Sequence, residues 1–382
     1  MTDSAYPSAL PSTEGDAASM PPPAQHPSTR PLERLRGALS RASQAAAPAA
    51  RGRFLILTHR GPDPDALGAC EGLRQLLRDE YGYEPVVATV GTIHRAENQA
   101  MVRTLELESE NYADVDRTGF AGVLLVDTQP EFGHTVVPDD LPIVAVFDHH
   151  VPPKTGDDPR PEVDYRDVRL DMGATCSIIW EYLRDAGVVL DIKTAGALFC
   201  GVRYDTADLS RNATELDEEA YTACFRHADR EKIASIDHPP LPPTYFASLH
   251  RALSVSRRHG PLVLTLMGKV DNPESVAEMA DFFLRMTGCS WVLAGAEFEG
   301  EYVLSLRTDY NFGKAYPLMR RVLDGLGSFG GHGHIAGGRI KLEDDGESTV
   351  KSVERILRSN ALDVIGAVAE DGIPEEGKPL TE

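Results

Sequence analysis

An acid and two histidines, Asp148, His149 and His150, are the residues from which chemistry is first expected, because they follow directly on a short apolar run. The run, residues 142–146, is rich in β-branched residues and too short for a helix, which is typical of a buried parallel strand. Ligands of open α/β sheets bind outside the carboxyl ends of the strands. A histidine pair alone is more typical of an exposed loop, so its interpretation depends on the other strand and helix ends.

A second group of ligand-type side chains lies on one predicted strand-to-helix turn. His59 ends the predicted strand 53–59, and Asp63 and Asp65 follow before a predicted helix begins. The prolines on either side of Asp63 keep this turn extended. Asp65 alone would be interpreted as a helix N-cap, which is common, but three ligand-type residues on one turn are less common.

Two more carboxylates end predicted elements of the same half. Asp127 ends the apolar segment 121–127, and Asp205 lies at the C-terminal end of the predicted helix 193–206. An aspartate at a strand end is most often a turn former. A carboxylate at a helix C-terminus is disfavoured by the helix dipole, so Asp205 indicates a compensating cation.

Together these residues form a candidate metal set at one edge of a parallel sheet. The set comprises two imidazoles and four carboxylates: His59, Asp63, Asp65, Asp127, His149 and Asp205. Oxygen and imidazole ligands without cysteine suit manganese or magnesium better than zinc. Two ions about 3.5–4 Å apart that share a carboxylate are the arrangement for in-line phosphoryl displacement. We therefore expect two divalent metal ions, Mn²⁺ in the first place, with Mg²⁺ and Co²⁺ as alternatives.

A glycine-rich stretch near the C-terminus offers a different kind of site. Residues 327–340 hold six glycines together with His332 and His334. A flexible loop is one interpretation. The other is a close-approach loop whose backbone N–H groups and histidines meet an anionic ligand. Arg307, on the predicted strand before it, offers a bidentate contact to phosphate.

Composition limits the possible partners. The chain has 382 residues with 42% hydrophobic composition and a net charge of −21. Residues 51–250 hold 19 Lys and Arg against 35 Asp and Glu, which argues against binding long duplex nucleic acid through its backbone. The five cysteines are scattered, as expected of buried free thiols in a reducing compartment. No signal peptide and no apolar run of about 18 residues is present, so we expect a cytoplasmic protein without a membrane partner.

The elements that position these residues predict an α/β fold in two domains. An N-terminal domain would have a mostly parallel sheet flanked by helices, and a smaller α+β C-terminal domain would follow, with a cleft between them. Four prolines within residues 236–246 indicate the boundary. The expected ranges are a disordered tail (1–30), a catalytic domain (31–235), a linker (236–255), a substrate-binding domain (256–345), and a C-terminal helix with an acidic tail (346–382).

In its motifs the chain resembles the DHH phosphoesterase superfamily, in the two-domain form with a DHH-associated C-terminal domain that bears a Gly-Gly-His motif. The motifs that match are 59-HRGPDPDALGA-69, 126-VD-127, 148-DHH-150, 201-GVRYDT-206 and 330-GGHGHIAGG-338. The resemblance spans roughly residues 32–345, and the ordered motifs are highly specific together although none is so alone. The chain departs from the pattern in carrying two histidines in the glycine-rich stretch, and in Gly68-Ala69 where a Gly-Ser pair is frequent.

The resemblance implies a role for each residue. One metal would be held by His59, Asp63 and Asp127, and the second by Asp65, Asp127, His149 and Asp205. Asp148 would orient an imidazole, and His150 would face the scissile phosphate. The substrate would be gripped by Arg307, Gly330, Gly331 and one of His332 and His334.

Within this family we expect a manganese-dependent hydrolase of short phosphodiesters or nucleotide phosphates. Its substrate would be a short oligoribonucleotide, a linear or cyclic dinucleotide such as cyclic di-AMP, or 3′-phosphoadenosine 5′-phosphate. The resemblance also leaves a homodimer open.

Three alternatives stay open. A RecJ-like single-strand exonuclease would need an added oligonucleotide-binding domain with a basic groove and stacking aromatics. A pyrophosphatase or exopolyphosphatase of the superfamily would carry a different C-terminal signature. A non-catalytic nucleotide-binding protein would lack some of the metal ligands, whereas here all six positions are filled.

Overall fold

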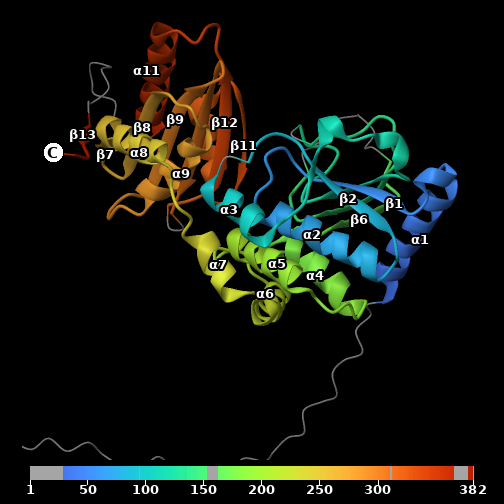
Figure 1. Cartoon of the computed structure of the whole chain (residues 1–382). Coiled ribbons are helices and arrows are strands. Elements are labelled where there is room, and N and C mark those ends of the chain that lie inside the picture. Colours follow the sequence, from blue (N-terminus) through green and yellow to red (C-terminus); the bar gives the residue numbers. More distant parts are fainter. Residues whose placement is uncertain are drawn as a thin grey trace, which may run out of the picture.

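The structure, a computed structural model, describes residues 29–381 except 94, 134, 153–161, 310–311 and 365–376. The predicted N-terminal tail up to residue 28 and most of the predicted acidic C-terminal tail lie outside the described residues. The remaining chain forms two layered α/β units, which lie side by side in Figure 1.

The first domain is built on a six-stranded sheet in the order β3-β2-β1-β4-β5-β6, and every pair of neighbouring strands is parallel. The strands are β1 (Arg53–Leu57), β2 (Glu84–Thr89), β3 (Glu110–Asn111), β4 (Val123–Val126), β5 (Ile143–Asp148) and β6 (Tyr165–Val168). The strand order runs outward in opposite directions from β1 and β4. The carboxyl ends of these two neighbouring strands therefore mark the topological switch point, where ligands of such sheets bind.

Seven helices of the first domain are α1 (Thr29–Ala45), α2 (Pro64–Asp79), α3 (Ala96–Leu105), α4 (Thr175–Asp185), α5 (Ile192–Asp205), α6 (Glu215–His227) and α7 (Arg230–Asp237). The central strands are buried on both faces, which explains their continuous apolar runs. Alternate residues of β1 point to opposite faces of the sheet. Phe54 and Ile56 belong to the hydrophobic cluster on the face that α2, α4 and α5 cover, and Leu55 and Leu57 belong to the hydrophobic cluster on the opposite face. Figure 1 shows α2, α4, α5 and α6 as one layer beside the sheet.

Two glycines allow the helices beneath the predicted site to pack backbone against backbone. A Cβ atom on Gly68 of α2 would lie 2.4 Å from the backbone oxygen of Ala197 in α5. A Cβ atom on Gly201 of α5 would lie 2.3 Å from Cys176 Sγ in α4 and 3.0 Å from the Cα atom of Asp65. Only glycine fits at such distances. The close packing brings the start of α2 next to the end of α5.

The second domain has a seven-stranded mixed sheet in the order β11-β12-β10-β9-β8-β7-β13. Its strands are β7 (Arg257–His259), β8 (Leu262–Lys269), β9 (Trp291–Phe298), β10 (Glu301–Thr308), β11 (Ser328–His332), β12 (Ile335–Lys341) and β13 (Lys378–Pro379). Only the pairing of β8 with β9 is parallel among these strands. The helices are α8 (Pro243–Val255), α9 (Glu274–Leu284), α10 (Ala315–Leu323) and α11 (Glu347–Val364). Clusters on the two faces pack against α8 and α9, and against α10 and α11.

The α/β fold class, with a parallel first sheet and a second mixed sheet, confirms the prediction. The prediction of a loop over 327–340 is wrong, because β11 and β12 form an antiparallel hairpin there. Its glycines serve packing as well as chain freedom. A Cβ atom on Gly338 would lie 2.2 Å from Leu323 Cδ1 of α10, so the helix can cover the hairpin only because that position is bare.

The predicted linker 236–255 contains helix α8, which begins directly after a run of prolines. Proline is favoured in the first turn of a helix, where its missing N–H has no intrahelical partner. Tyr245, Leu249 and Leu253 of α8 pack against the second sheet's core. The helix therefore belongs structurally to the second domain. No helix within the described residues is both long and apolar enough to cross a bilayer.

Candidate metal centre

Three neighbouring strands of the first sheet deliver ligand-type residues to the switch point. His59 follows the end of β1 by two residues, Asp127 follows β4 directly, and Asp148 is the last residue of β5. Since β1, β4 and β5 are adjacent and parallel, their carboxyl ends meet at one edge of the sheet. His149 and His150 follow at the same edge.

Asp127 has an unusual backbone conformation for a residue with a side chain. Its φ angle is 56°, in the left-handed region, which aspartate tolerates better than most residues. The backbone nitrogen of Asp127 donates a hydrogen bond of 2.8 Å to the carbonyl of Phe147 on β5. The chain thus turns sharply after β4, and only 2% of Asp127 is exposed, between the two histidine groups described next.

The first group comprises His59, Asp63 and Asp127. His59 Nε2 lies 3.9 Å from Asp63 Oδ1 and 3.6 Å from Asp127 Oδ2. The other ring nitrogen, Nδ1, lies 3.2 Å from the carbonyl oxygen of Arg60, to which it can donate its proton. In the tautomer that carries its proton on Nδ1, Nε2 keeps a lone pair for a metal ion, as a metal-binding imidazole requires.

The second group surrounds His149. Its Nε2 lies 3.2 Å from Asp205 Oδ2, 3.8 Å from Asp127 Oδ1 and 3.9 Å from Asp65 Oδ2. Its Nδ1 lies 3.1 Å from the carbonyl oxygen of Met172, which again leaves Nε2 for a ligand. Nε2 is buried and makes no hydrogen bond with any described residue. Nε2 is therefore surrounded by carboxylate oxygens, with which it forms an ion pair when protonated and shares a metal ion when neutral.

Asp65 is fully buried, and the N-terminus of α4 holds it. Its Oδ2 accepts a hydrogen bond of 2.7 Å from the amide of Thr175, and its Oδ1 one of 2.8 Å from the amide of Cys176. The hydroxyl of Thr175 donates to Asp127 Oδ1 at 2.8 Å. Sequence reasoning missed Thr175, although a hydroxyl residue at the start of a helix near predicted acids was an available signal.

Asp148 and His150 form a pair beside these groups. Asp148 Oδ1 lies 2.8 Å from His150 Nδ1 and accepts a hydrogen bond of 2.9 Å from the amide of His149. Its Oδ2 accepts one of 2.6 Å from Gln129 Nε2, which also donates to the carbonyl of His150. Asp148 and Gln129 thereby fix the orientation of the His150 ring. Gln129 was not among the predicted site residues, because a glutamine two positions after a predicted ligand carries no distinctive signal.

Several carboxylates of this buried cluster repel one another. Burial raises the pKa of Asp65 well above its usual value, and the neighbouring carboxylates Asp127 and Asp205 raise it further. Burial also raises the pKa of Asp205, against the effect of His149. The pKa of Asp127 is lowered because His59, His150 and His149 outweigh its burial. Buried carboxylates that repel one another in this way need positive charge, which protonated histidines or bound metal ions supply.

The donor set therefore fits a pair of divalent cations. The ligand atoms of His59, Asp63 and Asp127 lie within 4.8 Å of one another, and so do those of Asp65, His149 and Asp205. Asp127 directs one oxygen toward His59 and the other toward His149, so that it lies between the groups. A third group of the same compactness joins Asp127 to His149 and His150.

Arg307 lies on β10 of the second domain, and β12 and β11, the next two strands on one side of β10, carry paired glycines close to it. Ser305 of β10 pairs with Gly337 of β12, which pairs with Gly330 of β11. A Cβ atom on Gly330 would meet nothing within 4 Å, whereas one on Gly331 would lie 2.4 Å from the backbone oxygen of Ile335. Gly330 therefore leaves room for a ligand beside the sheet, and the place of Gly331 is taken by the hairpin itself.

The two histidines of the hairpin differ in their positions. The backbone of His332 pairs with Ile335, which pairs on its other side with Arg307, so residue 332 shares a cross-strand row with the arginine. His334 lies in the turn, and its Nδ1 is 3.1 Å from the hydroxyl of Thr308. Figure 1 shows β11, the edge strand, on the side of the second domain that is turned toward the first.

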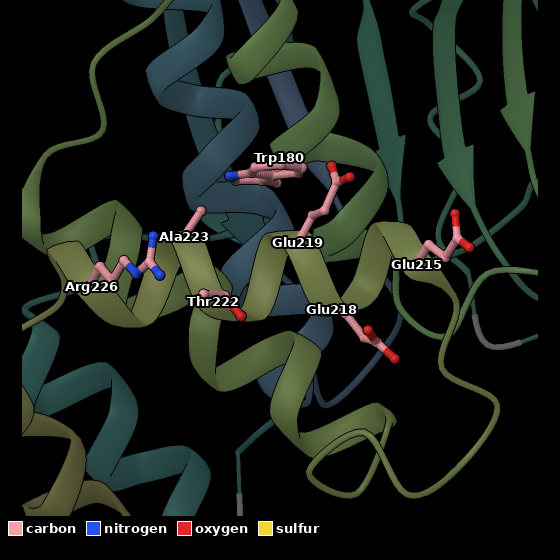
Figure 2. A pocket seen from close by; sticks show the side chains of 7 residues that line it. All are labelled: Trp180, Glu215, Glu218, Glu219, Thr222, Ala223 and Arg226. Atoms are coloured by element: carbon pink, nitrogen blue, oxygen red, sulfur yellow. The ribbon is translucent and has the colours of Figure 1, made fainter. Parts of the chain in front are cut away.

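A wide hollow of about 690 Å³ lies elsewhere, between α4 and α6. Figure 2 shows the side chains that line it, which are Trp180, Glu215, Glu218, Glu219, Thr222, Ala223 and Arg226. None of the predicted site residues is among them. The hollow is open to solvent and has no buried unpartnered ligand atom, so its size does not make it the functional site.

Comparison with known families agrees with this geometry. The model of the DHH family N-terminal domain matches residues 53–202, and that of the DHHA1 domain matches residues 260–359. The chain therefore contains a DHH family domain and a DHHA1 domain. The first match contains all the predicted metal ligands except Asp205, which lies three residues beyond its end. The second contains Arg307 and the glycine hairpin.

Curated relatives share parts of the chain. An uncharacterized protein of Methanocaldococcus jannaschii is 30% identical over 329 residues, which are 83% of this chain and 65% of the relative. A probable manganese-dependent inorganic pyrophosphatase of Streptococcus suis is 25% identical over 173 residues, which are 45% of this chain and 54% of the relative. The chain thus spans just under two thirds of the length of the first relative and about half of the length of the second.

A solved structure supports the fold alone. The exopolyphosphatase-related protein from Bacteroides fragilis superimposes with a TM-score of 0.65 at 14% identity, covering 87% of this chain and 98% of the other. The two chains therefore share the arrangement of both domains.

Proposed function

We propose that the chain is a manganese-dependent phosphoesterase that hydrolyses short phosphodiesters or nucleotide phosphates. The observation that carries the proposal is the buried Nε2 of His149, which lies among the carboxylates of Asp65, Asp127 and Asp205 and makes no hydrogen bond with any described residue. When bound, two divalent ions would supply Lewis-acid stabilisation and a water nucleophile at neutral pH. His59, Asp63 and Asp127 would hold one ion, and Asp65, Asp127, His149 and Asp205 the other. The relative named as manganese-dependent supports the choice of manganese.

His150, which Asp148 orients, lies beside the metal set and would contact the reacting phosphate. Asp148 holds the imidazole of His150 through Nδ1, and Asp148 together with the other neighbouring carboxylates raises the pKa of His150 to about 9 against the effect of burial. A protonated imidazole beside a phosphate can donate a hydrogen bond to a developing oxyanion. His150 would therefore bind and stabilise the scissile phosphate.

The second domain would grip the rest of the substrate. Arg307 provides a guanidinium, and Gly330 provides an open stretch of backbone close to it in the sheet. We propose that His332 contacts the substrate rather than His334, because residue 332 shares the row of Arg307 whereas His334 contacts Thr308.

The acidic first domain favours short substrates over a long strand, which would need basic patches along its path. The substrates that fit are oligoribonucleotides of a few residues, linear or cyclic dinucleotides, and 3′-phosphoadenosine 5′-phosphate. A pyrophosphatase or exopolyphosphatase activity is the second candidate, favoured by the similarity to the Streptococcus suis protein. A cytoplasmic location and a homodimer stay predictions.

A hydrolysis panel with manganese tests the proposal. It contains linear di-adenylate, cyclic di-adenylate, 3′-phosphoadenosine 5′-phosphate, a five-nucleotide RNA, a long single-stranded DNA and pyrophosphate, with Asp127→Asn as the control. We expect turnover of the small nucleotides that is lost in the variant. Preference for long DNA would replace the proposal with a RecJ-like exonuclease, and preference for pyrophosphate with a pyrophosphatase.

A further inference from the structure

One carboxylate contacts an arginine from each of the two domains. Asp281 lies on α9 of the second domain, and Arg307 Nε donates to its Oδ1 at 2.6 Å. Arg95 immediately precedes α3 of the first domain, and its Nη2 donates to Asp281 Oδ2 at 3.5 Å. The two oxygens of one side chain are thus divided between the domains.

On the side of the second domain, Asp281 fixes the plane of the Arg307 guanidinium. Arg307 Nη1 donates to Ser305 Oγ at 2.7 Å, in addition to the bond from Nε to Asp281. Nη2 makes no hydrogen bond with any described residue, and the side chain is only 11% exposed. Two of the three nitrogens are therefore held, and the third remains to bind an anion.

On the side of the first domain, Arg95 is anchored beside the metal set. Its Nη1 donates a hydrogen bond to the hydroxyl of Tyr204, and its guanidinium lies 5.5 Å from the centre of the same ring. Tyr204 directly precedes Asp205 at the end of α5. Arg95 and Tyr204 thus extend a continuous set of contacts from a predicted metal ligand to Asp281 and Arg307.

From this arrangement we propose that Asp281 is a positioning residue, which orients Arg307 for substrate only while Arg95 joins the two domains. The proposal rests on the proposed function, because it concerns how the substrate-binding arginine is held. Arg95 is its partner in the first domain. Asp281 fixes the guanidinium of Arg307, and Arg95 of the first domain holds Asp281. Arg307 therefore binds an anionic substrate most tightly while the contact between Arg95 and Asp281 is made.

Steady-state kinetics on linear di-adenylate with manganese test the proposal. Asp281→Ala and Arg95→Ala should each raise KM about fivefold and leave kcat within about twofold, since a partly exposed ion pair that orients a ligand group contributes at this level. Because both residues act through one contact set, the double variant should be no worse than the worse single variant. Alanine is a good helix former, so Asp281→Ala keeps α9.

Two controls separate positioning from general damage. Arg339→Ala removes an ion pair of 2.8 Å with Glu301 on the same sheet and should leave KM unchanged. A small chromogenic phosphodiester, bis(4-nitrophenyl) phosphate, carries no second phosphate for Arg307, so its KM should not change in any of the variants. An unchanged KM for di-adenylate in Asp281→Ala, or an equal rise for both substrates, would overturn the proposal.

A measurement without turnover distinguishes this proposal from the proposed function. If the wild-type protein hydrolyses none of the panel compounds, the proposed function fails, and small-angle X-ray scattering decides the domain contact. We then expect a larger radius of gyration for Arg95→Ala and Asp281→Ala than for the wild type and Arg339→Ala. Equal radii in all four proteins would contradict the joining role of the pair.

Discussion

Oδ2 of Asp65 lies 2.7 Å from the backbone nitrogen of Thr175, at the first turn of α4. A side chain predicted to bind metal thus also caps a helix from another part of the chain. The carboxylate satisfies two amide groups that no residue within the helix can reach. The metal set and the packing of α4 are therefore coupled through Asp65.

Replacing Asp65 by alanine should destabilise the protein even when no metal is present. Two buried amides would lose their acceptor, and we expect a loss of about 2 kcal/mol in the free energy of unfolding, measured by urea denaturation in EDTA. Asp205→Ala is the control, because no described amide donates to its carboxylate, whereas removal of either aspartate relieves repulsion among the buried carboxylates. Equal losses in the two variants would show that the amide contacts contribute nothing.

Gly201→Ala should disturb the centre through packing. The new methyl group would lie 2.3 Å from Cys176 Sγ and would push α4 and α5 apart, so we expect a loss of more than about 2 kcal/mol and weaker manganese binding. Gly196→Ala on the same helix places its Cβ 3.1 Å from a movable Leu105 side chain and gains helix propensity. Denaturation midpoints of the two variants should differ clearly, and similar midpoints would contradict the close approach.

Glu278 predicts a pH effect at the domain boundary. Burial raises its pKa to about 7; Arg95 opposes this, and Glu97, Glu274 and Asp281 add to it. Tyr245 of α8 is a further titratable neighbour. Oε2 of Glu278 is buried without a hydrogen-bond partner among the described residues.

Because this pKa is raised, the folded protein holds a proton that the unfolded chain releases, and the associated stability is lost as the pH rises from the ordinary value of 4.5 through about 7. Glu278→Gln keeps the neutral form at every pH. It should be more stable than the wild type by roughly 1 kcal/mol at pH 8, after allowance for partial exposure, and the difference should disappear below pH 4.5. A difference independent of pH in thermal melts would refute this assignment.

The two histidines of the hairpin should respond differently to substitution. His332→Ala should raise KM for a dinucleotide about tenfold, if its contact is made in both ground and transition states. His334→Ala removes the contact with Thr308 and should lower the melting temperature with little effect on KM. The reverse pattern would assign the substrate contact to His334.

Much of the first domain could be predicted from the sequence because its signals are local. Apolar runs that end on His59, Asp127 and Asp148 indicate buried parallel strands, and parallel strands bring their carboxyl ends together. Asp63 and Asp65 lie on a turn that two prolines hold extended. The structure brings these residues together with His149 and Asp205.

What the sequence did not show depends on contacts between distant residues. The glycine hairpin was predicted as a loop because its pairing partner, β10, and its covering helix, α10, leave no trace in the stretch itself. The same holds for Asp281, which meets Arg95 across 186 positions of the chain. Helix α8 was predicted as part of a linker because of the prolines at its start, although Tyr245, Leu249 and Leu253 recur at helical spacing.

The central claim, two metal ions that share Asp127, is tested most directly by counting bound manganese. Equilibrium dialysis should give two Mn²⁺ per chain in the wild type, one each in His59→Ala and Asp205→Asn, and none held tightly in Asp127→Asn. His334→Ala should keep both ions. A wild type that binds a single ion, or an Asp127→Asn variant that keeps two, would contradict the shared-ligand arrangement.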